Sequence, residues 1–185
     1  MCDNVFENLI ISLDEFNTYT GDYEDSVEVK GQKARTLATA QQIVEEYLGY
    51  HVFSCDHTEV ISGVDQRKVF LHSLPVTYVY DVSVNGYELS SGFGYVNDHD
   101  SIYLDKKPCP KDEIKVHYAA GFSRNNVPAV IRQTILRIAT LLYTEGSENI
   151  AVSSKSYADG SRSFMNYNSF DKFLKPLRSL KSTWV

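Results

Sequence analysis

The spacing of apolar residues along the chain predicts four helices. Apolar side chains recur every three or four residues from Gln32 to Leu48, and again after Pro128, which suits the first position of a helix. Ser12-Leu13-Asp14-Glu15 has the form of a capping box and predicts a shorter helix, while Pro176 is expected to interrupt or kink the last one. Three glycines are placed to end helices: Gly21, Gly49 and Gly146. The expected helices span residues 12–19, 32–48, 128–145 and 170–181.

Between the second and third helices the pattern changes to the two-residue alternation of β-strands. Five or six antiparallel strands are expected in residues 58–120. Asn85-Gly86 predicts a hairpin, because a type I′ turn needs positive φ at both central positions. Residues 147–169 are polar and aromatic and show no clear period. We therefore expect a single α+β domain over residues 1–185, a helical frame of about four helices with an antiparallel β-rich insertion between the second and third.

Charge is distributed unevenly along the chain. The net charge is −6, yet residues 1–65 hold 13 acidic and 3 basic residues, whereas residues 66–185 hold 11 and 15. Part of the excess acid lies in one run that is expected to be an exposed, solvated loop: Asp22, Glu24, Asp25 and Glu28. No basic face suited to phosphates is visible, which argues against nucleic-acid recognition as the main activity.

The cysteines and the N-terminus point to a reducing compartment. Cys2, Cys55 and Cys109 are an odd number at wide spacings and give no disulfide framework. No signal peptide and no membrane-spanning stretch is visible, so we expect a soluble protein synthesised in a cytoplasm. Cys55-Asp56-His57, with His51 nearby, is one group of potential metal ligands, but a second pair at zinc spacing is missing, and neither Cys109 nor His117 completes the set. No metal site is predicted.

Motifs for catalysis are also missing from the sequence. It contains no Gly-x-Ser-x-Gly elbow, no phosphate-binding loop followed by Lys and no His-Glu-x-x-His. Gly92-Phe93-Gly94 precedes an expected strand and not a helix, which argues against a dinucleotide loop. Asn97-Asp98-His99-Asp100 resembles the start of a calcium loop but lacks its glycine and closing acid, so a turn with solvated acids is expected. Neither an enzyme nor a cofactor site is predicted.

The C-terminal segment has the composition of an interface. Residues 162–181 contain five basic residues and one acid, interleaved with aromatic rings, and aromatic residues with Arg are typical interface anchors. Two interpretations stay open: a last helix that packs on its own core, or a segment that orders on a partner. The candidate partner contacts are Phe164, Tyr167, Phe170, Phe173, Leu174, Leu177, Arg178, Lys181 and Trp184.

The order of these features resembles the head–tail connector (adaptor) proteins of tailed phages. The segments that carry the resemblance are Ser12-Leu13-Asp14-Glu15-Phe16, Ala40 through Tyr47-Leu48-Gly49, Leu74-Pro75-Val76 leading to Asn85-Gly86, and Val116-His117-Tyr118-Ala119-Ala120-Gly121-Phe122 followed by Val127-Pro128 and an apolar helix. Two features depart from the family pattern: the long acidic loop after Gly21, and a β-region larger than in the smallest members.

The resemblance implies a structural virion protein at the neck. Its copies would close into a ring beneath the portal, twelvefold like the portal, and link the DNA-filled head to the tail or the next neck protein. DNA would pass through the channel without sequence-specific binding. In the family the C-terminal segment reaches toward the portal. An acidic first third and a basic remainder would suit the two different patches that meet in a cyclic ring.

Two alternatives remain. One is a tail-completion or stopper-like neck protein, which would share the ring but bind the next layer. The other is a monomeric binding module built on the β-region, which would gather aromatic residues on one exposed sheet face.

Overall fold

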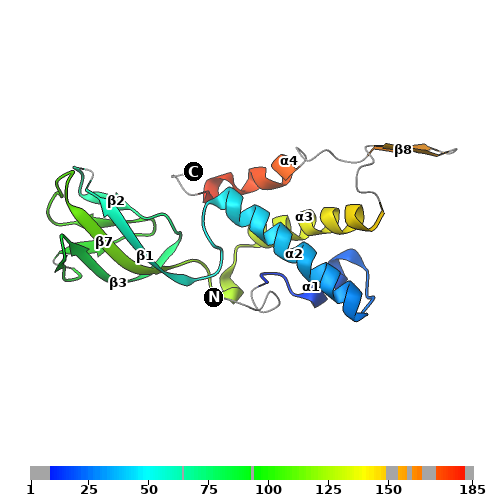
Figure 1. Cartoon of the computed structure of the whole chain (residues 1–185), viewed down its shortest axis with the longest axis horizontal. Coiled ribbons are helices and arrows are strands. Elements are labelled where there is room, and N and C mark those ends of the chain that lie inside the picture. The colour runs from blue at the N-terminus through cyan, green and yellow to red at the C-terminus, as the bar shows by residue number, and fades with distance from the viewer. Residues whose placement is uncertain are drawn as a thin grey trace. The chain divides into compact units, whose positions relative to one another are not determined.

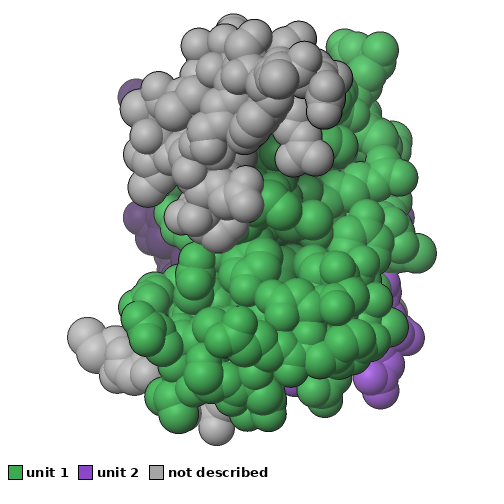
Figure 2. Space-filling view, turned by 90° about the vertical axis from the view of Figure 1, so that its right-hand side faces the viewer, with its two compact units in different colours: residues 1–47, 128–181 green, residues 48–127, 182–185 purple. Residues whose placement is uncertain are grey.

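The computed structural model describes residues 9–63, 65–92, 94–148, 154–157, 160–163 and 170–181. The chain forms two compact units (Figure 1 and Figure 2). The helical unit comprises Met1–Tyr47 and Pro128–Lys181, and the sheet unit comprises Leu48–Val127 with Ser182–Val185. Four α-helices and antiparallel sheets confirm the predicted α+β class. The sequence predicts a single connector domain. We propose that the two compact units act together as one subunit.

The helical unit packs α1 and the C-terminal helices around α3. Its elements are α1 (Leu13–Thr20), α2 (Val27–Leu48), α3 (Ala129–Glu148), α4 (Asp171–Leu174) and the 3₁₀-helix η3 (Lys175–Leu180). Ser12 caps α1 as predicted, since its hydroxyl accepts a hydrogen bond from the Glu15 N–H at 3.1 Å. Apolar positions at helical spacing are fully buried, including Phe16, Leu37, Val44, Ile131 and Ile138.

Two helix boundaries differ from the prediction. α2 begins at Val27 and not at residue 32, because the Ser26 hydroxyl and carbonyl accept bonds from the N–H groups of Val29 and Lys30 and so start the helix. This first turn is exposed and therefore carries no apolar period. α3 continues through Gly146 to Glu148. A glycine inside a helix costs only about 1 kcal/mol relative to alanine, so it does not have to end one.

The C-terminal part of the helical unit also departs from the prediction in detail. The last helix is α-helical only to Leu174 and continues as η3, with Pro176 in its first turn, so the predicted interruption is confirmed. Within residues 147–169, two short strands pair as a hairpin, β8 (Ser154–Tyr157) and β9 (Gly160–Ser163). Their sequence lacks the apolar alternation from which a strand can be predicted.

The sheet unit contains a four-stranded and a three-stranded antiparallel sheet. Its strands are β1 (Cys55–Ser62), β2 (Lys68–Phe70), β3 (Val76–Val84), β4 (Tyr87–Glu88), β5 (Tyr95–Asn97), β6 (Ser101–Leu104) and β7 (Glu113–Ala120), with orders β1-β7-β3-β4 and β2-β6-β5. There are seven described strands in place of the five or six predicted, and the first begins at Cys55 and not at residue 58. The sequence does not predict the first three residues of β1, because Cys55 and Asp56 are exposed and His57 is only partly buried, so no apolar alternation marks them.

One core joins the two sheets. Val82, Ile114, Val116 and Tyr118 project from the larger sheet, and Ile102 from the smaller, into one buried cluster. The predicted hairpin is confirmed at β3–β4, where Asn85 and Gly86 have φ of 51° and 79°.

A paired stem closes the sheet unit. Phe53 and Phe122 form a β-bridge, and Phe122 N–H donates to the Val52 carbonyl at 2.7 Å. Gly121 has φ of 112°, and a Cβ at this position would lie 2.6 Å from the Phe53 carbonyl oxygen. Only glycine fits this position, because the two backbones approach too closely for a side chain. The entry and exit of the unit therefore lie side by side.

Candidate interaction surfaces

The predicted C-terminal contact segment divides into a buried and an exposed side. Leu174 and Leu177 are buried, and the Thr134 hydroxyl of α3 donates to the Phe173 carbonyl at 3.4 Å. The other side exposes three cations, which we name the basic ridge: Lys172, Lys175 and Arg178. For the two leucines, this burial favours the interpretation in which the last helix packs on its own core. The exposed side remains available to a partner.

The remaining predicted contacts lie in different settings. Phe170 and Phe173 are partly buried. The Lys181 ammonium lies 5.3 Å from the centroid of the Tyr47 ring, near the C-terminal end of α2. Phe164, Tyr167 and Trp184 lie outside the described residues.

A buried lysine organises the segment between α1 and α2. Lys33 is only 1% exposed, and its ammonium donates to the Asn17 side chain and to the Asp22 and Glu24 carbonyls at 2.8–3.1 Å. The Asp22 carboxylate lies 3.4 Å from the same ammonium. Every N–H of a buried ammonium needs an acceptor, and here α1 and the following loop supply them. The expectation of a solvated acidic loop is therefore wrong for Asp22.

The Asp22 carboxylate also reaches α3. The Tyr143 hydroxyl donates to Asp22 Oδ2 at 2.7 Å, and this hydrogen bond is the main reason that the pKa of Asp22 is lowered from 3.8. Burial, and secondarily the bond to Asp22, raises the pKa of Tyr143 to about 12. Lys33, Asp22 and Tyr143 thus bind α2, the loop and α3 together.

This fixed loop presents apolar and acidic side chains outward. Tyr23 is 68% exposed and Val27 is 89% exposed, and the neighbouring Glu24 and Glu28 are exposed as well. We name these four residues the acidic corner. Glu28 lies in the first turn of α2 and not in a loop, where its charge favours the helix N-terminus.

A second exposed aromatic group lies on the sheet unit. On the outer face of β3 and β7, Tyr78 and Tyr80 contact each other with ring centroids 5.1 Å apart, and Tyr80 lies 4.7 Å from the His117 ring. The Tyr80 hydroxyl donates to Asp56 at 2.8 Å, which raises its pKa, and His117 lies 3.1 Å from Asp81. We name these five residues the tyrosine face. It is the feature expected of the binding-module alternative.

Inside the sheet unit, Tyr118 organises a polar network. Its hydroxyl donates to the Glu59 carboxylate and accepts from the Ser73 N–H at 3.1 Å, while Glu59 also accepts from His72. Burial is the main cause of the raised pKa of Tyr118, followed by the bond to Glu59. These groups satisfy one another, so we interpret the network as structural.

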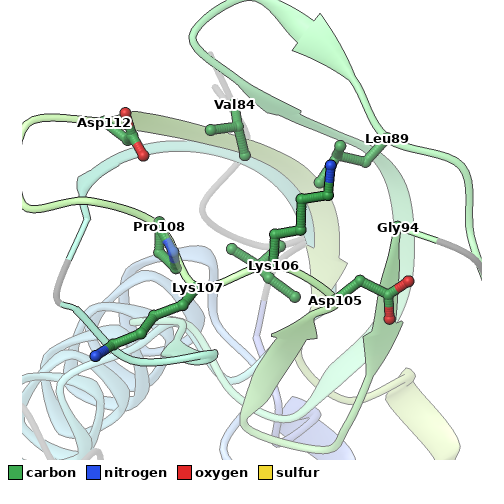
Figure 3. Close-up of a pocket in the computed structure, with 9 residues that line it drawn as sticks. Val84, Leu89, Gly94, Asp105, Lys106, Lys107, Pro108 and Asp112 are labelled. Carbon is green, nitrogen blue, oxygen red and sulfur yellow. The ribbon is translucent and has the colours of Figure 1, made fainter.

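A pocket of about 360 Å³ opens in the sheet unit (Figure 3). Its lining combines Val84, Leu89 and Leu104 with the charged loop after β6. Two of its charged groups already have partners. Lys107 pairs with Asp65 at 2.9 Å, and Asp112 accepts bonds from Asn85 and the Cys109 N–H, with the Asn85 bond the main cause of its lowered pKa. Figure 3 shows Lys106 and Lys107 directed apart, so the pocket lacks convergent polar groups.

The other possible sites from the sequence have local structural roles. Cys55 Sγ lies 3.2 Å from His57 Nε2, and burial lowers the pKa of His57. In the part of the chain that the structure describes, no three His, Cys, Asp or Glu residues converge to hold a metal ion. In the predicted turn at residues 97–100, Asn97 ends β5 and residues 98–100 lead to β6, with Asp100 paired to Lys68 at 3.4 Å.

Sequence analysis missed both the acidic corner and the tyrosine face. A signal for the corner was present, since Tyr23 and Val27 interrupt the acidic run. The face depends on bulges in β3 near residues 77 and 80 that change which side chains point outward. No local pattern in the sequence predicts those bulges.

Comparison with known proteins gives one family and several similar structures. A family model described as "Head completion protein" matches residues 9–174. No curated protein sequence matches the chain.

The similar structures come from gene transfer agent (GTA) particles. One chain, from "Virion of native gene transfer agent (GTA) particle", is 14% identical with a TM-score of 0.61, covering 93% of this chain and 89% of that one. Another, from "Neck of empty GTA particle computed with C6 symmetry", is 13% identical with a TM-score of 0.58 and the same coverage. A third, from "Neck of native GTA particle computed with C12 symmetry", is 14% identical with a TM-score of 0.55, covering 91% and 89%. At this identity the likeness shows a shared fold.

Proposed function

The chain belongs to the head completion protein family, and on that premise we propose that it is a structural virion protein of the neck, a head–tail connector (adaptor) subunit. Its copies form a ring beneath the portal and link the DNA-filled head to the tail or to the next neck protein. The observation that carries this proposal is the family match over residues 9–174, together with a fold shared with chains of GTA neck structures.

The same comparisons support the ring and a twelvefold order. The titles of two similar structures describe necks computed with C6 and C12 symmetry. A ring of twelve copies around the portal axis is consistent with both. The net charge of −6 suits a subunit near a DNA channel, since a strongly basic wall would hold the passing DNA.

For the portal contact, we propose the aromatic part of the C-terminal segment. Phe170 and Phe173 are partly buried, which leaves part of each ring available, and Phe164, Tyr167 and Trp184 continue the aromatic series on either side. Rings of this kind are frequent anchors in protein interfaces. Trp184→Ala is expected to weaken recovery of the portal while leaving the ring of this chain intact.

No catalytic activity is part of this proposal. Head completion is a structural role, and the buried polar groups of the sheet unit satisfy one another. A stopper-like position, one layer further from the head, remains the second candidate, because the same ring would serve either layer.

The test is a tagged pull-down from cells that assemble the particle, with negative-stain microscopy and mass spectrometry of the recovered material. A ring carrying a portal-sized protein is the expected result. A second experiment distinguishes the adaptor position from the stopper position. In it, DNA-filled tailless heads are mixed with the purified chain. An adaptor binds these heads directly, whereas a stopper binds only after another neck protein is added. A monomer that binds neither heads nor a virion protein would contradict the proposal and favour the binding module.

A further inference from the structure

The acidic corner has the composition of half of an interface. Tyr23 and Val27 are exposed at 68% and 89%, and the described residues offer neither side chain a hydrogen bond or ring contact. Glu24 and Glu28 surround them with negative charge and form no ion pair within the described ranges. A partner of this surface must bring positive charge together with apolar contact.

The backbone under this corner is already fixed. Lys33 holds the Asp22 and Glu24 carbonyls at 2.8 and 3.1 Å, and Tyr143 holds the Asp22 carboxylate at 2.7 Å. A preformed surface loses little conformational entropy when a partner binds. The exposure of Tyr23 therefore rests on a fixed loop backbone, and Val27 is held beside it as the first residue of α2.

The basic ridge has the complementary composition. Lys172, Lys175 and Arg178 are exposed, and none has a carboxylate partner in the part of the chain that the structure describes. Phe173 and the exposed Pro176 lie between them and supply apolar surface. Buried Leu174 and Leu177 fix the ridge on α3.

Within one copy the two surfaces lie at opposite ends of α2. The acidic corner lies at the N-terminal end, where Val27 begins the helix. Lys181, directly after η3, lies over Tyr47 at the other end, and Figure 1 shows the red η3 beside the cyan C-terminal end of α2. The 22 residues of α2 span about 33 Å, which is several times the reach of an ion pair and more than the Debye length of about 8 Å.

We propose that the acidic corner of one copy binds the basic ridge of the next copy, as the head-to-tail contact of the ring. Two different patches on one chain generate a closed ring when the rotation between neighbours closes. Opposite charges at the two ends of α2 also define the direction of assembly, because a corner repels another corner and a ridge repels another ridge. This inference rests on the proposed function, which supplies the ring.

Reversing the charges of the acidic corner, of the basic ridge, or of both tests this contact. One variant, Glu24→Lys/Glu28→Lys, makes both patches basic; a second, Lys175→Glu/Arg178→Glu, makes both acidic; a third combines all four changes. The third keeps the wild-type net charge of −6. Self-association of each purified chain is measured by sedimentation velocity over a concentration series at low salt.

Each of the first two variants is expected to self-associate at least about a hundredfold more weakly than wild type, because like charges now face each other. Their equimolar mixture should associate again, in alternating order, which an even-numbered ring permits. The third variant, which carries all four substitutions, should associate with itself and not with wild type. Tyr23→Ser alone should weaken association about tenfold, as loss of an aromatic anchor does.

Matched controls carry the same charge changes on exposed positions of the sheet unit, Glu88→Lys/Glu113→Lys and Lys106→Glu/Lys111→Glu. They should associate as wild type does. Three results would overturn the proposed contact. The first two variants could associate as strongly as wild type, or their mixture could fail to associate. The wild-type chain could also stay monomeric at every concentration. A neck position seen by microscopy in those cases would leave the proposed function standing, with the charged patches assigned to another virion protein.

Discussion

The two units expose tyrosines in contrasting settings. On the sheet unit, Tyr80 is 46% exposed, yet it donates to Asp56 and stacks on Tyr78 and His117. On the helical unit, Tyr23 is more exposed and has no such contact among the described side chains. The sheet tyrosines thus have local partners that account for their position. The backbone at Tyr23 is fixed, but no contact among the described residues accounts for the position of its ring.

The contrast shows that exposure alone does not identify an interface. An exposed ring with several partners in its own unit is stabilised where it lies, with or without another molecule. An exposed ring without them gains its contacts only when a partner arrives. Substitutions can test the two units one at a time, because each unit has a core of its own.

The largest expected effect comes from the stem of the sheet unit. Gly121→Ala places a Cβ 2.6 Å from the Phe53 carbonyl oxygen at φ of 112° and should destabilise that unit by about 3 kcal/mol or more. Hydrogen exchange should accelerate in β1, β3 and β7 and not in α1–α3. Gly86→Ala is the control, since its φ of 79° is strained but no atom lies within 4 Å; about 1 kcal/mol is expected. Equal effects at the two positions would contradict the close-approach argument.

The converse experiment disrupts the helical unit. Lys33→Met removes the donor for the Asp22 and Glu24 carbonyls and the cation beside the Asp22 carboxylate. A loss of about 2–4 kcal/mol is expected, because the side-chain and carbonyl oxygens that close over Lys33 lose their donor. Exchange should accelerate at the amides of α1 and the start of α2, with the sheets unchanged. Lys30→Met, which breaks the exposed pair with Asp25, should cost less than about 0.5 kcal/mol.

Tyr118 and Tyr80 allow a buried and an exposed tyrosine of the same unit to be compared. Tyr118→Phe leaves the Ser73 N–H and Glu59 without the hydroxyl between them and should cost about 1–3 kcal/mol. Tyr80→Phe breaks only an exposed bond to Asp56 and should cost less than about 0.5 kcal/mol. Chemical denaturation of both variants gives the two free energies. Similar values would contradict a structural role for the hydrogen-bond network around Tyr118.

A smaller effect is expected from pH. Because the pKa of Asp22 in the folded chain lies below its ordinary value of 3.8, its contribution to stability is fully present above about pH 4 and is lost as the pH falls through the lower, folded pKa. Asp22 is partly exposed, so the loss should be about 1 kcal/mol or less. Unfolding free energies measured from pH 5.5 to pH 2.5 should fall less steeply for Asp22→Asn than for wild type. An identical slope would contradict the assignment.

The smallest effect is expected at the tyrosine face. Tyr78→Ser/Tyr80→Ser should change self-association by no more than about twofold, in contrast to the tenfold loss expected for Tyr23→Ser. Sedimentation velocity on the same concentration series gives both numbers. A loss as large as that of Tyr23→Ser would reverse the comparison and make the tyrosine face a contact between copies.

The elements that the sequence predicted well are those fixed by local chemistry. Asn85-Gly86 needs no distant residue to form its turn, and the Ser12 cap and the Pro176 interruption act within one helical turn. The same holds for the buried stripes of α2 and α3, whose period follows from burying one face. The resemblance to head–tail connectors rested on the order of these local features, and the family match confirms it.

The features that escaped prediction depend on contacts between distant residues. A lysine in an acidic region indicates a surface position, yet Lys33 is buried, because acceptors from α1 and the following loop close over it. Leu174 and Leu177 are predicted as partner contacts from the sequence, yet they are buried where α4 and η3 pack on α3. In both cases burial is decided by the packing of helices that are far apart in the sequence.

The paired stem at Phe53 and Phe122 has a consequence for the history of this chain. A segment that enters and leaves a fold through one closed pair of backbones can be lengthened, shortened or exchanged by recombination without breaking the helices on either side. Gly121, which permits that closure, would then be retained while the strands beyond it diverge. The stem is thus a point at which the β-region can change in length while the backbone entering and leaving it stays paired.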